Sequence, residues 1–411
     1  MRSAGTAGIS CAMLLAAPDD EQGPAPIPLE VESMLEHPPH EAVQQDTLTE
    51  GDLSVAAIPE AADAARQIVF VAGPGRSGTS LMSGILKHMG LHVPEPEVAA
   101  DKTNPKGFGE PAWVVDFHEE LLGRVHVQPG DARPGAWFDA GRACIQEMNR
   151  SRLAEWLDPQ FEAAETLVIK DPRISWFLGL WRVAAVRVGA STSTIVMLRP
   201  PAEVVGSASA TAGERSDETS GGRFDDISRL AGWTNVMLFT ERATRGSSRS
   251  FVRYHDLLAD WTSTVVRVGE ELGLADVTDA GTGRMQEVHR FVDPELHRSR
   301  TTWDDLSVPG ALREIAEATW QQLDLLAEPG GDSPEAHAKL DVLRREYGVL
   351  YAEAEAMARS SVAAAGPSYL EETRKAAASA AALDDDSAAR KAYLRTRRAA
   401  GRVKRRLRGD G

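Results

Sequence analysis

A glycine-rich segment around residue 75 constrains the fold of this chain more than any other feature. An uninterrupted apolar stretch, IVFV at residues 68–71, precedes it, as expected of a strand buried on both faces. GPGRSGTS follows at residues 73–80, and apolar residues then recur at helical spacing until Gly90. A strand, a glycine turn and a helix in this order predict the opening unit of a parallel α/β sheet.

Alternating strands and helices continue along the chain. Further buried strands are predicted in ETLVIKDP, STSTIVMLRPP and RSFVRYHDLL, at residues 165–172, 191–201 and 249–258. Helices are predicted at residues 174–189, 202–210 and 261–274. This order predicts a three-layer α/β/α fold with a central parallel sheet, in which a ligand lies at the carboxyl ends of the strands.

Composition divides the chain into three parts. Residues 1–66 are rich in Pro, Ala, Asp and Glu, and their only basic residues are Arg2 and Arg66, so this acidic leader is expected to be disordered. The short apolar run after Arg2 faintly resembles a signal peptide, and the preferred alternatives are a disordered leader or a start site placed too early. The α/β domain is expected over residues 67–325, and a helical C-terminal extension with a basic tail over residues 326–411.

Two polar segments each have two interpretations. TAGERSDETSGGR, at residues 211–223, is either a solvated loop or a mobile lid over the site. The tail at residues 390–408 holds ten basic residues and no acid. It is either a solvated helix that offsets the acidic leader or a peripheral contact with anionic membrane lipid.

Charge, cysteine content and the lack of long apolar runs exclude several classes of protein. A net charge of −16 argues against nucleic-acid binding by the chain as a whole. Cys11 and Cys144 are the only cysteines, so neither a disulfide framework nor a cysteine-based zinc site is expected, and a reducing compartment suits the chain. The sequence has no apolar run of about 18 residues, the length that would predict a membrane span. We therefore expect a cytoplasmic protein, with the inner membrane face as the site of any lipid contact.

The loop at residues 73–80 offers groups suited to an anion. Its three glycines permit a tight turn with inward-facing N–H groups, and the dipole of the following helix adds attraction. Its hydroxyls and the permanent charge of Arg76 supply further contacts. A loop for nucleoside triphosphates carries a lysine after the second glycine, but Thr79 stands there in this chain. The segment therefore suits one closely bound phosphate better than a triphosphate with magnesium.

Several segments of the chain resemble sulfotransferases that use 3′-phosphoadenosine 5′-phosphosulfate (PAPS). GPGRSGTS resembles the 5′-phosphosulfate-binding loop of this family, and LRPPAEVVGSAS resembles its 3′-phosphate-binding segment. FVRYHDLL resembles the strand whose tyrosine lies near the adenine, and LVIKDPRISWF the strand beside the sulfuryl group. NPKGFGE resembles a segment that follows the first helix in bacterial members. The similarity covers about residues 67–300, and it implies a P-loop-like fold and metal-independent sulfuryl transfer to a hydroxyl.

The resemblance also assigns the donor-binding residues. These are Gly75, Arg76, Ser77, Gly78, Thr79 and Ser80 in the loop, with Arg199, Ser207 and Tyr254 further along the chain. The spacing of Arg199 and Ser207 has a physical basis of its own, because an arginine at a strand end and a hydroxyl one or two turns into the next helix can converge on one phosphate. Two separate phosphate sites on one sheet imply a bisphosphorylated nucleotide.

Sulfuryl transfer needs a cation for the leaving phosphate and a base for the acceptor hydroxyl. Arg76 is predicted to stabilise the leaving group, helped by the N–H groups of the loop. Glu110, at the end of NPKGFGE, is the first candidate base, and Asp171 in KDPR is the second. The alternative role for Asp171, which follows Lys170, is that of a partner in a structural ion pair. Lys170 and Lys106 are candidate contacts to the sulfuryl oxygens.

The remaining polar and aromatic candidate residues each have more than one possible role. Arg173 either binds the acceptor or pairs with an acid. The histidines near the predicted site are expected on helix surfaces or in packing roles; they are His88, His92 and His118. Four aromatic residues either stack on the acceptor or belong to the core, namely Phe108, Trp113, Trp137 and Phe138.

Three functions therefore stand as hypotheses. The first is a PAPS-dependent sulfotransferase that acts on a small-molecule or glycan acceptor, with a carbohydrate or glycolipid suggested by bacterial relatives. The second is a nucleotide kinase or NTPase with a degenerate Walker A loop, against which Thr79 counts. The third is a non-catalytic scaffold, which would need neither Arg76 nor Arg199.

Overall fold

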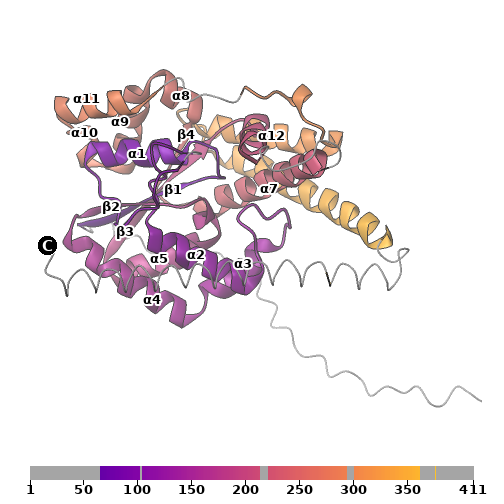
Figure 1. The fold of residues 1–411 in the computed structure, drawn as a ribbon, viewed down its shortest axis with the longest axis horizontal. Helices are drawn as coiled ribbons and strands as arrows, with labels where there is room; N and C mark the ends of the chain where they lie inside the picture. The colour runs from indigo at the N-terminus through magenta and orange to yellow at the C-terminus, as the bar shows by residue number, and fades with distance from the viewer. Residues whose placement is uncertain (1–64, 102–103, 213–220, 294–299, 362–374, 376–411) are drawn as a thin grey trace, which may run out of the picture. The chain divides into compact units, whose positions relative to one another are not determined.

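The predicted strands form one parallel sheet in the order β2-β1-β3-β4 (Figure 1). The computed structural model describes residues 65–101, 104–212, 221–293, 300–361 and 375. Within these ranges the strands are β1 Arg66–Ala72, β2 Thr166–Lys170, β3 Ala190–Leu198 and β4 Arg249–Arg253. All three neighbouring pairs are parallel, so the carboxyl ends of the strands meet at one edge. The predicted α/β fold with a central parallel sheet is confirmed.

Strand β1 lies inside the sheet because its side chains are apolar on both faces. Ile68 and Phe70 pack into a core beneath one face, and Val69 and Val71 pack into a second core on the other. All four are fully buried. An unbroken apolar run is what a strand covered by helices on both sides requires.

Helices cover each face of the sheet and complete the three layers (Figure 1). One face is covered by α2 Ala112–Val125, α3 Ala136–Cys144, α4 Glu147–Leu157 and α5 Leu178–Arg187. The other face is covered by α1 Thr79–Met89, α8 Tyr254–Ala259, α9 Trp261–Leu272, α10 Ala275–Thr278 and α11 Thr282–Phe291. The short 3₁₀ segments are Asp158–Glu162, Pro172–Phe177 and Trp303–Asp305. Gly90 closes α1, as the sequence predicted, and Gly273 closes α9; both have the left-handed backbone conformation.

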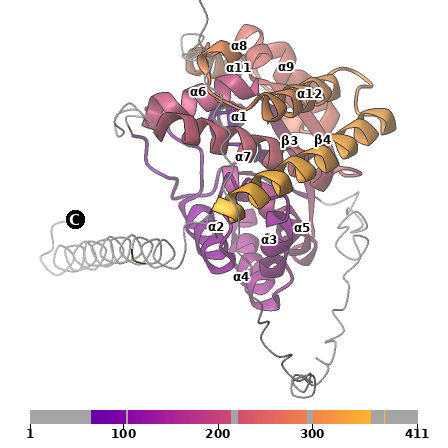
Figure 2. The ribbon, with the colours of Figure 1, turned by 90° about the vertical axis from the view of Figure 1, so that its right-hand side faces the viewer.

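A third apolar cluster forms at the β3–β4 side of the sheet. It brings together α6 Pro201–Ala212, α7 Gly221–Thr244, α12 Gly310–Leu326 and a last helix over residues 334–361. Figure 2 shows the last helix, in orange and yellow, running past α7. Its residues Leu340, Leu343 and Tyr347 are buried, and the Tyr347 hydroxyl lies 2.6 Å from the Ala132 carbonyl oxygen. The described part of the predicted C-terminal extension, up to residue 361, is therefore largely helical and shares a core with β3 and β4.

The structure corrects two predicted elements. The helix predicted over residues 174–189 starts with the 3₁₀ segment from Pro172, and regular α-helix begins only at Leu178. The strand predicted over residues 249–258 ends at Arg253, and the chain turns into α8. The reason is visible in the sequence, because Tyr254 and Leu257 are buried at a spacing of three, which suits a helix and not a strand.

Several predictions lie outside the described residues. These concern the acidic leader, most of the polar segment at 211–223 and the basic tail at 390–408. None of the helices in the described ranges combines the length and apolar character needed to span a bilayer. In the same ranges, no group of three or more His, Cys, Asp or Glu side chains is arranged to hold a metal ion.

Candidate active site

The glycine-rich loop connects β1 to α1 at the carboxyl edge of the sheet. Gly73 has φ +133°, and a Cβ there would lie 3.0 Å from the Met197 carbonyl oxygen on β3. Gly78 has φ +93°, and a Cβ there would come within 2.4 Å of the Tyr254 ring. Both positions therefore need glycine for two reasons, a left-handed backbone and a close neighbour.

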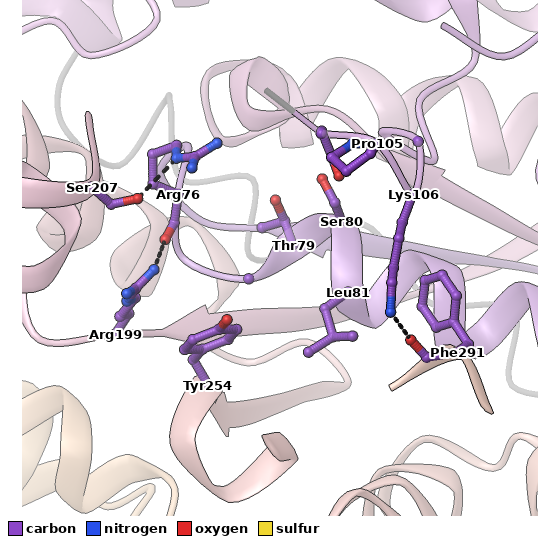
Figure 3. A pocket seen from close by; sticks show the side chains of 13 residues that line it. Arg76, Thr79, Ser80, Leu81, Pro105, Lys106, Arg199, Ser207, Tyr254 and Phe291 are labelled. Carbon is purple, nitrogen blue, oxygen red and sulfur yellow. Dashed lines mark hydrogen bonds between the residues drawn. The ribbon is translucent and has the colours of Figure 1, made fainter. Parts of the chain in front are cut away.

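Arg76 has a left-handed backbone conformation without being glycine. Its φ is +73°, a region that costs a bulky residue about 1–3 kcal/mol. Two hydrogen bonds hold it: Nη1 of Arg199 donates to the Arg76 carbonyl oxygen at 3.0 Å, and Nε of Arg76 donates to the Ser207 hydroxyl at 3.1 Å (Figure 3). The loop and the predicted 3′-phosphate segment are thus joined directly, across more than 120 residues of sequence.

A pocket opens where these segments meet (Figure 3). It is lined by Arg76, Gly78, Thr79, Ser80, Leu81, Asn104, Pro105, Lys106, Gly107, Arg199, Ser207, Tyr254 and Phe291. The lining includes residues from each of the three segments that the sequence singled out for a nucleotide, at 75–80, at 199–207 and at 254. Gly75 and Ser77, which the sequence also assigned to the donor, do not line it.

Ser77 supports the loop from behind. Its side chain is fully buried, and within the described residues its hydroxyl has no hydrogen-bond partner. Its N–H donates to the Pro74 carbonyl oxygen at 3.2 Å. Any direct contact of Ser77 with a ligand remains a prediction, whereas Thr79 and Ser80 lie on the pocket wall.

The N-terminus of α1 faces this pocket without a side-chain cap. The N-cap is Gly78, which offers no side-chain acceptor to the first N–H groups of the helix. The first three residues of α1, Thr79, Ser80 and Leu81, line the pocket. Uncapped N–H groups and the positive end of a helix dipole attract anions, and Arg76 lies beside them here.

A second cation lies at the other side of the loop. Arg199 follows the end of β3, and its guanidinium stacks over the Tyr254 ring at 4.7 Å from the ring centroid. Its Nε donates to Glu203 Oε2 at 3.0 Å. Ser207 lies two turns further along α6 and lines the same pocket, so the predicted pair of Arg199 and Ser207 does converge.

The opposite wall combines the predicted segment around Lys106 with α11, which the sequence motifs did not identify. Phe291, the last residue of α11, lines the pocket beside Leu81 and residues 104–107. Lys106 Nζ donates to the Phe291 carbonyl oxygen at 2.6 Å and lies 3.7 Å from Asp293 Oδ2. Lys106 therefore ties two walls of the pocket together. Phe291 belongs to no local motif, and only the packing of α11 against α1 brings it here.

Glu110 and Lys170 form a buried ion pair next to the pocket. Lys170 Nζ donates to Glu110 Oε1 and, at 3.2 Å, to the Ser80 hydroxyl. Burial raises the pKa of the Glu110 carboxyl, although the Lys170 ammonium opposes this. Burial also lowers the pKa of the Lys170 amine, against the pull of Glu110. A carboxyl with a raised pKa and a lysine with a lowered one, linked through Ser80 to the pocket, is an arrangement suited to proton transfer.

Asp171 is engaged on both oxygens. Its Oδ1 accepts from the N–H and Nη1 of Arg173 at 2.7 and 3.0 Å, and its Oδ2 lies 3.2 Å from His118 Nδ1. Burial opposes ionisation, but the hydrogen bonds from His118 and Arg173 and the charge of Arg173 outweigh it and lower the pKa of Asp171. Asp171 is fully buried and does not line the pocket. Glu110 and Lys170 are also buried and do not line it either, but the contact of Lys170 with Ser80 connects that pair to the pocket wall, so Glu110 stays the first candidate base.

His118 and Arg173 complete this buried cluster. Trp181 Nε1, which can only donate, lies 2.8 Å from His118 Nε2, so the proton of the imidazole belongs on Nδ1, toward Asp171. His118 is fully buried and has the packing role that the sequence predicted. Arg173 pairs with Asp171 and with Glu119, at 2.7 Å, which supports the ion-pair interpretation of this residue.

None of the aromatic candidates lines the pocket. Trp113 stacks between Phe117 and Trp156 against the core beneath α2, as the core interpretation predicted. Trp137 is partly buried against the same core, and the Phe138 ring next to it is 43% exposed. Neither these residues nor Phe108 line the pocket.

Comparisons with known proteins give structural matches alone. No protein-family model and no curated protein matches the chain. The sulfotransferase domain of a Synechococcus olefin synthase matches at 15% identity and a TM-score of 0.35, over 63% of this chain and 94% of that one. The sulfotransferase STF1 of Mycobacterium tuberculosis matches at 15% identity and 0.38, over 62% and 76%. The sulfotransferase domain of the curacin biosynthetic pathway matches at 14% and 0.35, over 63% and 98%.

The chain is similar to these sulfotransferases in fold alone.

Proposed function

We propose that this protein transfers the sulfuryl group of PAPS to a hydroxyl acceptor. The observation that carries the proposal is the pocket in which Arg76, beside the uncapped start of α1, and Arg199, beside Ser207, lie on one cavity. A donor with phosphate groups at two separate positions of its ribose needs two cationic sites of this kind.

The residues of the pocket fit the parts of such a donor. The 5′-phosphosulfate would bind the N–H groups at the start of α1 together with Arg76. The ribose 3′-phosphate would bind Arg199 and the Ser207 hydroxyl. Tyr254, Leu81 and Phe291 give the pocket apolar and aromatic surface, which suits the base of the nucleotide.

The chemistry follows from these positions. The acceptor oxygen attacks sulfur in line, an O–S bond forms, and the bond from sulfur to the bridging phosphate oxygen breaks. Arg76 stabilises the negative charge that gathers on the leaving adenosine 3′,5′-bisphosphate. Glu110 accepts the proton of the hydroxyl, and Lys170, which bridges Glu110 and Ser80, contacts the sulfuryl oxygens. We include no metal ion in this step, because a sulfuryl group carries less charge than a phosphoryl group.

The acceptor and the cellular setting belong to the proposal as well. We propose a small-molecule or glycan acceptor, such as the hydroxyl of a carbohydrate or glycolipid, and a cytoplasmic protein whose basic tail meets anionic membrane lipid. Salt-dependent pelleting with anionic vesicles, for full-length protein against a chain ending at residue 388, tests the lipid contact. Equal pelleting of the two would contradict it.

A transfer assay tests the central activity. Purified protein is incubated with PAPS carrying labelled sulfur and an extract of host cells, and labelled products are identified by mass spectrometry. We expect donor-dependent sulfation of a hydroxyl compound with the wild-type protein and none with Arg76→Ala. Hydrolysis of magnesium–ATP without any sulfation would instead support the nucleotide kinase or NTPase hypothesis.

A further inference from the structure

Glu203 lies behind the second cationic site and takes no part in the function proposed above. It is in the first turn of α6, and its Oε2 accepts a hydrogen bond from Arg199 Nε at 3.0 Å. The same oxygen lies 3.1 Å from His255 Nε2. The side chains of Glu203 and Arg199 are 12% and 6% exposed, so this ion pair is largely screened from water. Glu203 does not line the pocket.

The contacts of Arg199 fix its guanidinium on several sides. Its Nε is held by Glu203, its Nη1 donates to the Arg76 carbonyl oxygen, and its face lies on the Tyr254 ring. A guanidinium is a planar fork, so holding its Nε edge sets the direction of the whole group. With Glu203 in place, the fork is directed at both the pocket and the strained backbone of Arg76.

We propose that Glu203 is a positioning residue that orients Arg199 for the ribose 3′-phosphate, and so lets the protein distinguish a 3′,5′-bisphosphate from a 5′-monophosphate. This inference rests on the proposed function, because it assigns Arg199 to the 3′-phosphate. Glu203 acts through Arg199 and does not touch the donor.

Charge and orientation predict opposite effects of removing Glu203. A carboxylate close to a phosphate site repels the phosphate, so if charge alone mattered, a variant without it would bind the bisphosphate more tightly. If orientation matters, the same variant would bind it more weakly, since Arg199 would no longer be held toward the pocket. The sign of the change therefore separates the two roles.

His255 provides the matched control. It contacts the same Oε2, but its side chain is 43% exposed and it contributes nothing to the pocket lining. His255→Ala removes one partner of Glu203 and leaves the ion pair of Glu203 with Arg199. The affinity of the His255→Ala variant for either nucleotide is expected to change less than about twofold, because the exposed contact of His255 with Glu203 contributes little.

The experiment measures two dissociation constants for each protein by calorimetry, one for adenosine 3′,5′-bisphosphate and one for adenosine 5′-monophosphate. In Glu203→Ala the ratio of the two affinities is expected to fall about tenfold, the size of one lost hydrogen bond between charged groups. Glu203→Gln, which keeps an acceptor but loses the charge, is expected to lie between Glu203→Ala and the wild type. A ratio of affinities does not depend on the folded fraction, so a purely structural role would leave it unchanged.

Two outcomes separate failure of this inference from failure of the proposed function. If the wild type binds both nucleotides equally, the 3′-phosphate site itself is wrong, and the inference fails with it. If the wild type prefers the bisphosphate and Glu203→Ala keeps or increases that preference, the proposed function stands and the positioning role of Glu203 is overturned.

Discussion

Two polar regions lie near the carboxyl edge of the sheet, and they differ in how their charges are used. The donor pocket, defined by Arg76, Arg199, Ser207 and Tyr254, presents its polar groups to a cavity. The buried cluster at the end of β2, defined by Glu110, His118, Lys170, Asp171 and Arg173, engages its charges largely with one another. The residue types alone do not distinguish the two regions, because each combines cationic side chains with hydroxyl or acidic ones.

The difference teaches where a ligand can gain binding energy. A charge that is paired and faces no cavity gains little from a ligand, whereas a helix start without a side-chain cap at a cavity gains a great deal from an anion. Lys170 links the regions, because it contacts Glu110 in the cluster and Ser80 in the pocket. The comparison therefore predicts large effects on activity for pocket residues and for the Glu110–Lys170 pair, and effects on stability for the rest of the cluster.

The largest effect is expected from Arg76→Ala, because it removes the cation proposed to stabilise the leaving phosphate. We expect kcat to fall about 10²- to 10³-fold, as measured by steady-state transfer from PAPS. Arg76→Gly separates side chain from backbone, since glycine adopts the left-handed conformation without strain. It should be as inactive as Arg76→Ala. An active Arg76→Gly would show that the Arg76 side chain is not needed and would contradict the comparison. Arg359→Ala, at an exposed position of the last helix, is the surface control.

The second largest effect is expected from Glu110→Gln, which should also change the pH dependence of activity. Glu110→Gln is expected to lower kcat about 10²-fold, because the acceptor loses its proposed general base. The base must be ionised, and burial raises the pKa of Glu110 above its usual 4.5, so wild-type activity should fall in acid from a higher pH than an exposed glutamate would give. A pH profile of kcat/KM measures this acid limb, which should disappear in Glu110→Gln. An unchanged limb would rule Glu110 out as the base.

A double variant separates catalysis from stability at this pair. Glu110→Gln alone leaves the Lys170 amine buried beside a neutral side chain and is expected to destabilise the fold. The double variant Glu110→Gln with Lys170→Met should recover much of the free energy of unfolding while staying inactive. Recovery of activity in the double variant would contradict the catalytic role of the pair.

Asp171→Asn is expected to change stability and not chemistry. The carboxylate accepts from Arg173 and His118 in a fully buried site, and removing its charge should cost about 3 kcal/mol of unfolding free energy by denaturant titration. Activity per folded molecule should stay within about threefold. If Asp171→Asn were stable and inactive, Asp171 would replace Glu110 as the candidate base.

The pH dependence of that stability effect has a defined sign. Burial opposes ionisation of Asp171, but its hydrogen bonds and the nearby charges lower its folded pKa below the usual 3.8. A lowered pKa contributes stability that is present above the unfolded value and is lost as pH falls through the folded value. The difference between wild type and Asp171→Asn should therefore be full at neutral pH and shrink in acid below about 3.8.

The smallest effect is expected from Lys106→Met. Its amine contacts the Phe291 carbonyl oxygen and ties two pocket walls, so we expect the KM for donor to rise about threefold with kcat unchanged. Lys170→Met is the matched lysine variant and should lower kcat instead. A large loss of kcat in Lys106→Met would instead assign the sulfuryl contact to Lys106, on the wall of the donor pocket, and not to Lys170 in the buried cluster.

Local patterns were sufficient to predict much of the fold and one side of the pocket. The apolar runs predicted all four strands, and the glycine loop with Arg199, Ser207 and Tyr254 predicted a shared site, because each signal lies within a single strand–turn–helix unit. The signals that failed depend on tertiary packing. Phe291 reaches the pocket only because α11 packs on α1, and the partner of Lys170 lies 60 residues away in sequence.

Finer conformational details also escaped prediction. The left-handed backbone of Arg76 is held by Arg199, more than 120 residues away, and no local rule places a non-glycine residue there. The burial of Ser77 behind the loop is likewise a result of packing, although its neighbours Thr79 and Ser80 reach the pocket wall. Sequence spacing gives the face of an element but not the final contacts of each side chain.

The most direct test of the account is calorimetry with two nucleotides. The central claim is that one pocket holds a nucleotide through phosphates at two positions of the ribose. Adenosine 3′,5′-bisphosphate without magnesium should release clear binding heat with the wild type and little or none with Arg76→Ala. Clear binding of magnesium–ATP with no heat from the bisphosphate would contradict the account.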